Sequence, residues 1–211
     1  MCFDVDSTVL GYEGIDVLAD YHGCGADVSA YTTQAMNGQC TFQDALAARL
    51  NIIQPKYDIL MKCINQHPLQ LTDGIRELIG KLHARGTLVY LVSGGFKQMI
   101  EPAARALHIP SHNIYANVLI FDDTPPYQYI DFDHSQPTSQ SGGKCIAIQH
   151  IKHANNLTSN DIIMIGDGIT DLEARVECGM FIGYGGIAVR AGVLNGADLF
   201  IKHWNQIIPY V

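Results

Sequence analysis

Two strongly apolar runs constrain the fold most, because each one stops at a glycine-rich polar turn. Residues 88–92 (Leu-Val-Tyr-Leu-Val) lead into Ser93-Gly94-Gly95, and residues 162–165 (Ile-Ile-Met-Ile) lead into Gly166-Asp167-Gly168. A strand that is apolar on both faces is typical of a parallel sheet covered by helices. In such sheets, ligands bind at the carboxyl ends of the strands. We therefore expect the polar turns to meet at one edge of the sheet.

Helical patterns alternate with these runs. Between residues 73 and 85, Ile75, Leu78, Ile79 and Leu82 recur at helical spacing, and Gly86 follows as a stop signal. Residues 99–107 and the segment after Gly142-Gly143 also read as helices. The alternation predicts an α/β fold with a doubly wound, Rossmann-like core and a parallel central sheet. Two β-rich runs around Thr124-Pro125-Pro126 predict a hairpin within residues 117–132.

Residues 14–66 carry a different pattern, with several short helical segments and no strand. The breaks are Gly23-Cys24-Gly25, Asn37-Gly38 and the step from Gln54 to Pro55. Four short helices in this position predict a small helical subdomain rather than a part of the sheet.

Composition excludes several classes of protein. The 211 residues are 47% hydrophobic and 16% charged, which suits a globular protein rather than a disordered one. A formal net charge of −8 disfavours non-specific nucleic-acid binding. No apolar run approaches the roughly 18 residues of a membrane span, and no signal-peptide pattern opens the chain. The six cysteines form no C-x-x-C pair, so we expect reduced thiols and a cytoplasmic protein.

Two carboxylates stand at the end of the first predicted strand. Asp4 and Asp6 are separated by one residue, and like charges so close need a cation or a shared proton nearby. The same pair also fits a solvated loop in which an Asp caps a helix, and the pair alone does not decide between the two. Only three residues precede Asp4, so we expect a short first strand with reduced backbone pairing.

Two further elements could bind an anion. Ser93 and the backbone N–H groups of the following glycines form an oxyanion-binding turn at a strand end, although an ordinary strand-to-helix turn has the same composition. Lys144 stands at a predicted helix N-terminus, where a positive charge is unfavourable unless an anion binds beside it. The glycines before Lys144 do not have the spacing of a P-loop.

The turn after the second apolar run contains a pair of acidic residues. Asp167 and Asp171 lie four residues apart, so on a helical turn they face the same way. Oxygen ligands without neighbouring Cys or His indicate Mg²⁺ rather than zinc. A dinucleotide site is the weaker interpretation, because the third glycine of G-x-G-x-x-G is missing.

These four elements together resemble the motifs of the haloacid dehalogenase superfamily. Asp4-Val5-Asp6-Ser7-Thr8 matches the first motif, Ser93 the second, Lys144 the third and residues 166–171 (Gly-Asp-Gly-Ile-Thr-Asp) the fourth. Within the superfamily, the flanking residues are similar to those of the phosphoserine phosphatase family. The resemblance covers nearly the whole chain. It implies a Rossmann-like catalytic core formed by residues 1–12 and 68–211, with residues 13–67 inserted after the first strand as a helical cap that would choose the substrate.

The resemblance implies a role for each motif residue. Asp4 would be the nucleophile and form an aspartyl-phosphate, and Asp6 would act first as acid and then as base. One Mg²⁺ would be held by Asp4, Asp167 and the backbone carbonyl of Asp6, with Asp171 in support. Ser93, the Gly94 amide and Lys144 would bind the phosphoryl oxygens.

The resemblance also implies a substrate, O-phospho-L-serine, and residues that select it. Glu13 would receive the ammonium group and Arg49 the carboxylate, while Met36 and Phe42 would form an apolar wall. Thr170 belongs to the same substrate-binding set. From spacing alone, Met36 and Phe42 fit the core of the cap equally well, and Glu13 and Arg49 fit solvated charges.

Other functions share parts of this pattern. Another capped phosphomonoesterase, or a phosphotransferase that passes phosphate to homoserine, would use the same aspartyl-phosphate. A receiver-type signalling module also groups acidic residues, a hydroxyl and a lysine around Mg²⁺, but its phospho-acceptor lies on a later strand. We expect no nucleic-acid or membrane partner, and the oligomeric state stays open, with a homodimer as one option.

Overall fold

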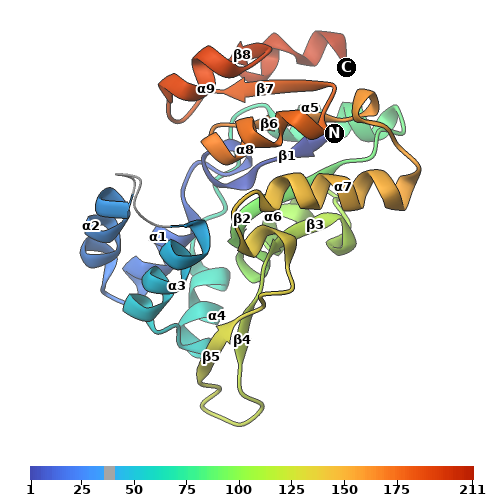
Figure 1. Cartoon of the computed structure of the whole chain (residues 1–211). Helices are drawn as coiled ribbons and strands as arrows, with labels where there is room; N and C mark the ends of the chain where they lie inside the picture. The colour runs from blue at the N-terminus through green and yellow to red at the C-terminus, as the bar shows by residue number, and fades with distance from the viewer. Residues whose placement is uncertain (36–40) are drawn as a thin grey trace.

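A six-stranded parallel sheet forms the centre of the computed structural model, which describes residues 1–35 and 41–211. The strand order is β3-β2-β1-β6-β7-β8, and every pairing in this sheet is parallel (Figure 1). The strands are β1 (Cys2–Phe3), β2 (Tyr90–Phe96), β3 (Ile114–Asn117), β6 (Ile163–Gly166), β7 (Met180–Tyr184) and β8 (Leu199–Ile201). The predicted α/β class with a parallel central sheet is confirmed.

Helices cover both faces of this sheet, as the two-sided apolar runs predict. Leu91 packs into one buried cluster together with residues of α5 and α6, whereas Tyr90 and Val92 pack into another with residues of α7 and α9. Alternate residues of a strand point to opposite faces, so a strand buried on both sides must be apolar throughout. The covering helices are α5 (Ile75–Ala84), α6 (Lys97–Ala106), α7 (Gly143–Asn155), α8 (Ile169–Glu173) and α9 (Ala191–Gly196).

Short 3-10 turns complete the connections: η2 (Ser111–Asn113), η3 (Pro137–Ser139), η4 (Ser159–Asp161), η5 (Ala174–Glu177), η6 (Trp204–Gln206) and η7 (Ile208–Tyr210).

The first strand is as short as predicted, but it does not lack pairing. Cys2 lies in register with Tyr90 on one side and with Met164 on the other. The backbone N–H of Asp4 continues the ladder by donating to the carbonyl of Ile165 at 2.8 Å. The expected loss of pairing is therefore wrong, because β1 lies between two longer strands and uses both of its edges.

The second strand runs further than its apolar run. We expected it to stop at Val92, whereas β2 continues through the glycines to Phe96. Its register against β3 shifts between Val92 and Phe96, so the segment 93–95 is the irregular part of the strand.

Four helices follow β1 and the irregular turn η1 (Val5–Val9), as predicted. They are α1 (Gly14–Tyr21), α2 (Gly25–Ala35), α3 (Phe42–Ile53) and α4 (Tyr57–Gln66). In Figure 1 they lie together to the lower left of the sheet. Leu18, Leu46, Leu50 and Leu60 form their buried cluster, which also includes Phe96 from β2. The helices thus share one apolar core that rests on the end of the sheet.

The predicted hairpin is formed by β4 (Leu119–Phe121) and β5 (Tyr129–Phe132), paired antiparallel. It projects beside α4 (Figure 1). The ring of Tyr57 on α4 contacts those of Phe121 and Tyr127 at centroid distances of 5.4 and 5.1 Å. The hairpin therefore supports the helices that follow β1, although it belongs to a distant part of the sequence.

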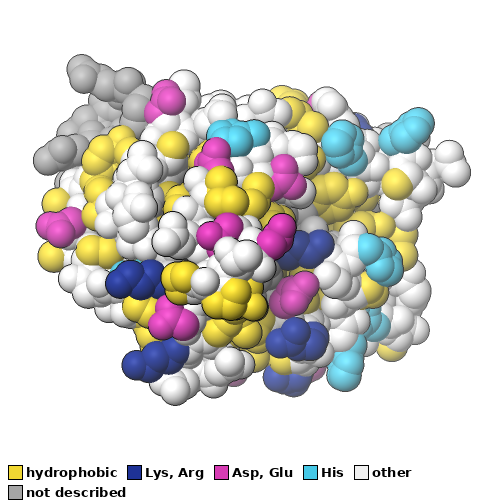
Figure 2. All heavy atoms as spheres, turned by 90° about the horizontal axis from the view of Figure 1, so that it is seen from below, with side chains coloured by type: hydrophobic (Ala, Val, Ile, Leu, Met, Phe, Trp, Pro, Cys, Tyr) yellow, Lys and Arg dark blue, Asp and Glu magenta, His cyan; other side chains and the backbone are white. Residues whose placement is uncertain are grey.

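The surface carries a mixture of side-chain types. On the face shown in Figure 2, acidic and basic side chains are interspersed with apolar ones. Over the described part of the chain, no helix combines the length and hydrophobicity of a membrane span.

Candidate active site

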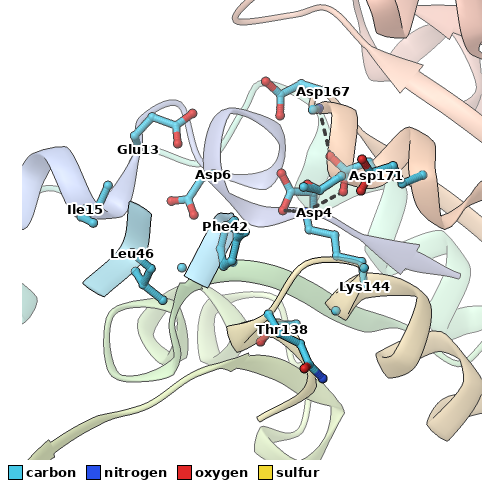
Figure 3. Close-up of a pocket in the computed structure, with 18 of the residues that line it drawn as sticks. Asp4, Asp6, Glu13, Ile15, Phe42, Leu46, Thr138, Lys144, Asp167 and Asp171 are labelled. Carbon is cyan, nitrogen blue, oxygen red and sulfur yellow. Dashed lines mark hydrogen bonds and ion pairs between the residues drawn. The ribbon is translucent and has the colours of Figure 1, made fainter. Parts of the chain in front are cut away.

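A pocket of about 170 Å³ lies where the carboxyl ends of β1, β2 and β6 meet the helices that follow β1. Figure 3 shows carboxylates from two separate segments of the chain on one side of it, and Phe42 and Leu46 of α3 on the other. The predicted residues Asp4, Asp6, Gly94, Lys144, Asp167 and Asp171 line this pocket. Ser93 is not among the lining residues, and its hydroxyl lies beside the pocket, bonded to Asp6 Oδ2. The structure thus brings together residues from distant parts of the sequence, from Asp4 to Asp171.

Lys144 joins two of the buried carboxylates. Its Nζ donates to Asp4 Oδ1 at 2.7 Å and to Asp171 Oδ1 at 2.6 Å. Asp4 comes directly after β1, whereas Lys144 lies in the first turn of α7 and Asp171 in α8. All three side chains are buried, so neither carboxylate could stay charged there without a cation beside it.

Burial and mutual repulsion shift the pKa values of this group. Burial, and then the neighbouring Asp171 carboxylate, raise the pKa of Asp4 well above its usual value, against the lowering effect of Lys144. Burial also raises the pKa of Asp171. For Lys144, burial would lower the pKa, but Asp171 and Asp4 outweigh it and the pKa is raised. The ammonium therefore stays charged, and the site has more negative charge than one lysine compensates.

Asp6 lines the same pocket and lies to the left of this ion pair in Figure 3. Its Oδ1 accepts a hydrogen bond from the Gly14 backbone N–H at 2.7 Å, and its Oδ2 accepts one from the Ser93 hydroxyl at 3.3 Å. Burial, and then the charge of Glu13, raise the pKa of Asp6 to about 7. A carboxyl group with a pKa near neutral pH is suited to both giving and taking a proton.

The glycines of the second motif allow close approach. A Cβ on Gly95 would lie 2.6 Å from Asp6 Oδ2, and a Cβ on Gly94 would lie 2.9 Å from the Cζ atom of Phe42. Asn117 holds the Gly94 carbonyl through a hydrogen bond of 2.7 Å, and Ser93 Oγ accepts from the Gly95 N–H at 2.9 Å. Side chains at positions 94 and 95 would push Phe42 and Asp6 out of the pocket.

Among the residues that the structure describes, one group has the composition and spacing of a cation site. Carboxylate oxygens of Asp4, Asp167 and Asp171 lie within 4.8 Å of one another. Both oxygens of Asp171 already accept hydrogen bonds, from Lys144 at 2.6 Å and from the Gly168 N–H at 3.0 Å. Asp4 uses only Oδ1 in this way. Hard oxygen donors with surplus negative charge fit a divalent cation such as Mg²⁺.

The substrate-binding residues predicted from the resemblance lie around the same pocket where the structure describes them. Glu13, Phe42, Arg49 and Thr170 all line it. Arg49 donates from Nε to the Ala45 carbonyl at 3.1 Å. Burial lowers the pKa of Arg49, while the charges of Asp16 and Glu13 oppose that lowering. Met36, the remaining predicted member, lies outside the described residues.

Sequence reasoning missed Arg190. This residue lines the pocket, and its Nε donates to Asp167 Oδ2 at 2.8 Å. Burial would lower the pKa of Arg190, but the hydrogen bond and charge of Asp167 raise it. Gly185-Gly186, directly after β7, gives the same strand-end signal as the other turns. That signal would have pointed to the loop, but it would not have identified the arginine within it.

The fold and the site define a hydrolase of the haloacid dehalogenase type, and a family model described as haloacid dehalogenase-like hydrolase matches residues 1–174. The chain belongs to this family.

Its curated relatives include phosphoserine phosphatases. The one from Drosophila melanogaster is 46% identical over 208 residues, which cover 99% of this chain and 76% of that protein. The one from Mus musculus is 44% identical, covering 99% of this chain and 91% of that protein. Among solved structures, a phosphoserine phosphohydrolase-like protein from Francisella tularensis has a TM-score of 0.84 at 28% identity, covering 100% of this chain and 98% of that one.

Proposed function

We propose that the chain hydrolyses O-phospho-L-serine to L-serine and phosphate, as the last step of serine biosynthesis. The observation that carries this proposal is the meeting of Asp4, Asp6 and Lys144 in one pocket that Glu13 and Arg49 also line, with the Ser93 hydroxyl bonded to Asp6. The first four side chains suit phosphoryl transfer, and the last two match an amino acid's ammonium and carboxylate groups. The phosphoserine phosphatases among the relatives support the same substrate.

In the first step, Asp4 attacks phosphorus. Its carboxylate oxygen forms a bond to phosphorus while the bond from phosphorus to the serine oxygen breaks. Asp6 gives its proton to the departing oxygen, so that neutral L-serine leaves. Lys144, Ser93 and the Gly94 N–H hold the phosphoryl oxygens as their charge redistributes.

In the second step, the aspartyl-phosphate on Asp4 is hydrolysed. Asp6, now ionised, takes a proton from the attacking water, whose oxygen bonds to phosphorus as the bond to Asp4 breaks. The Asp6 pKa of about 7 supports both roles, because neither protonation state is strongly disfavoured near neutral pH. Phe42, packed against Gly94, limits the access of other water to this intermediate.

One Mg²⁺ completes the site in this proposal. Asp4, Asp167 and the backbone carbonyl of Asp6 would hold it, and Asp171 would support them through Lys144 and Gly168. When bound, the ion supplies positive charge that neutralises the phosphoryl group and the carboxylates.

Residues 13–67 act as the cap in this scheme, and residues 1–12 and 68–211 as the core. Arg49 would hold the substrate carboxylate through a pair of parallel hydrogen bonds, because its terminal nitrogens are not engaged by the Ala45 contact. Glu13 would hold the ammonium group, and Phe42, Thr170 and Met36 would complete the enclosure. The cytoplasmic location, the homodimer option and the absence of nucleic-acid or membrane partners stay predictions of the sequence.

A phosphate-release screen tests the proposal. Phosphoserine, phosphothreonine, phosphoethanolamine and 3-phosphoglycerate would each be incubated with the protein, with and without Mg²⁺ and with homoserine as added acceptor. We expect Mg²⁺-dependent release with phosphoserine preferred by kcat/KM and no phosphohomoserine formed. Equal rates on all four compounds would contradict the proposed substrate, and phosphate appearing on homoserine would replace the hydrolase with a transferase.

A further inference from the structure

A serine in the first motif is bonded to the carboxylate expected to recognise the substrate amine. Ser7 Oγ donates to Glu13 Oε1 at 2.6 Å. Ser7 is only 5% exposed, so water competes little for this hydrogen bond. A hydroxyl bonded to a carboxylate at this distance makes a strong, charge-assisted hydrogen bond. This hydrogen bond does not position the nucleophile Asp4 or the proton carrier Asp6, because Ser7 makes no hydrogen bond to either side chain.

The backbone is shaped to make this contact. Ser7 has a φ of 53°, in the left-handed region that non-glycine residues rarely adopt. Two neighbouring hydrogen bonds tie the same stretches together: Ser7 N–H to the Tyr12 carbonyl at 3.2 Å, and Gly14 N–H to Asp6 Oδ1 at 2.7 Å. These bonds hold the start of α1 against the loop that carries Asp6. The Ser7 hydroxyl in addition holds the side chain of Glu13, the residue directly before the helix.

The hydroxyl also competes with a cation for the same oxygen. Arg190 Nη2 lies 3.7 Å from Glu13 Oε1, and its Nε is bonded to Asp167 at 2.8 Å. Without Ser7, the carboxylate would be free to turn towards the guanidinium and away from the substrate. With Oε1 held by Ser7, Oε2 accepts no hydrogen bond from any described residue and remains for a ligand. Figure 3 shows the Glu13 carboxylate on the pocket side of its backbone, above Asp6.

We infer that Ser7 is a positioning residue for substrate selection: its hydroxyl holds the Glu13 carboxylate in the orientation that receives the ammonium group. This inference rests on the proposed function. It extends the role of the first motif, because one five-residue segment then supplies the nucleophile, the proton carrier and the support for amine recognition.

Two variants test the inference. Ser7→Ala removes the hydroxyl, and Ser7→Gly removes it while adopting the left-handed backbone without strain. The substrates would be phosphoserine and 3-phosphonooxypropanoate, which has hydrogen in place of the ammonium group. We expect both variants to raise KM for phosphoserine about 10-fold, with kcat changed less than about 2-fold. Binding of the amine-free compound, measured as KM or as a competitive inhibition constant, should change less than about 2-fold.

Ser111→Ala is the matched control, because it removes another serine–glutamate hydrogen bond, to Glu101 at 3.1 Å on the exposed surface. A double-mutant cycle separates this role from a general effect on the structure. If Ser7 acts through Glu13, Ser7→Ala should have no further effect on KM in a Glu13→Ala background.

Equal losses with both substrates, or additive losses in the cycle, would overturn the role of Ser7 while leaving the phosphatase proposal intact. Absence of phosphoserine turnover by the unmodified chain would instead overturn the proposed function, and this inference with it.

Discussion

The ring of Phe42, at the start of α3, rests directly on the backbone of Gly94 in β2. A Cβ placed on Gly94 would lie 2.9 Å from Cζ and 3.2 Å from Cε2 of that ring. This contact joins the helices that follow β1 to the sheet at the mouth of the pocket. The closeness of the two segments depends on the absence of one methyl group.

Gly94→Ala is therefore expected to displace Phe42 and to raise KM for phosphoserine about 5-fold, the equivalent of about 1 kcal/mol of overpacking. Phe42→Leu in the same chain should recover part of the loss, because the smaller side chain leaves room for the methyl group. Steady-state kinetics of the single and double variants check this. Gly80→Ala is the control, since a Cβ there meets no atom within 4 Å. If the double variant is no better than Gly94→Ala, the contact with Phe42 is not the cause.

Asp4→Asn is expected to abolish phosphate release, by roughly 10³-fold or more, because an amide cannot form the covalent intermediate. Removing the charge also removes the cost of burying it and its repulsion with Asp171, the two effects that raise the pKa of Asp4. In the absence of Mg²⁺ we therefore expect a thermal midpoint no lower than that of the unmodified chain. Circular dichroism and a phosphate assay measure the two effects, and turnover at the original rate would rule out Asp4 as nucleophile.

Mg²⁺ is expected to stabilise the protein through the carboxylate group at the pocket. At a concentration 100 times its dissociation constant, the ion should contribute about 2.7 kcal/mol, which is a rise of roughly 5 to 10 °C in Tm for a chain of this size. Asp167→Asn should reduce that rise strongly, whereas Asp161→Asn, at the exposed turn η4, should not. A thermal-shift titration with Mg²⁺ and EDTA measures both, and an unchanged rise in Asp167→Asn would remove this residue from the metal site.

Arg49→Ala is expected to raise KM for phosphoserine by about 10- to 100-fold, because the substrate carboxylate loses a bidentate, charge-assisted contact. The KM for phosphoethanolamine, which has no carboxylate, should change much less. Arg49→Lys keeps the charge without the planar fork and should recover only part of the loss. A similar increase for both substrates would show that Arg49 acts on the fold of the pocket and not on the carboxylate.

Lowering the pH is expected to reduce the stability of the fold through protonation of Asp198, which lies between β7 and β8. The Phe181 backbone N–H and the Arg175 guanidinium hold the pKa of Asp198 below its usual value. A depressed folded-state pKa stabilises the protein above the unfolded-state pKa, about 4 for Asp, and this contribution is lost as the pH falls through the folded value. Asp198→Asn should therefore show a smaller fall in Tm between pH 6 and pH 3 than the unmodified chain, measured by calorimetry.

Asp123→Asn serves as the comparison for that measurement, since Asp123 is exposed and has no hydrogen-bond partner among the described residues. A pH dependence of Asp198→Asn equal to that of Asp123→Asn would contradict the role of Asp198.

The parts of the site that lie at strand ends are predictable from sequence. Asp4, Ser93 and Asp167 each follow an apolar run, and parallel strands end at one edge of the sheet, so their convergence needs only the topology. The helices of residues 14–66 are predictable in the same way, from their turn signals.

Contacts that depend on the exact path of the backbone are not predictable in this way. The Ser7–Glu13 hydrogen bond depends on a left-handed backbone at a residue that is not glycine. The Arg190–Asp167 contact depends on the path of a loop, and a loop has no hydrophobic periodicity from which its path could be predicted. The continuation of β2 to Phe96 was missed for a related reason. Glycines at a strand end are read as a stop, whereas here the pairing resumes beyond them, with Phe96 opposite Asn117.

The two-residue strand β1 also sets an order of events for the chain. Cys2 and Phe3 pair only with residues 90–91 and 164–165, so Asp4 has no fixed position until both neighbouring strands exist. Synthesis runs from the N-terminal to the C-terminal end, so β1 is made before both of the strands that pair with it. Asp4 therefore reaches its place only after the strand that contains residues 164–165 has been made, and a nascent chain that ends before that strand has no assembled phosphate site.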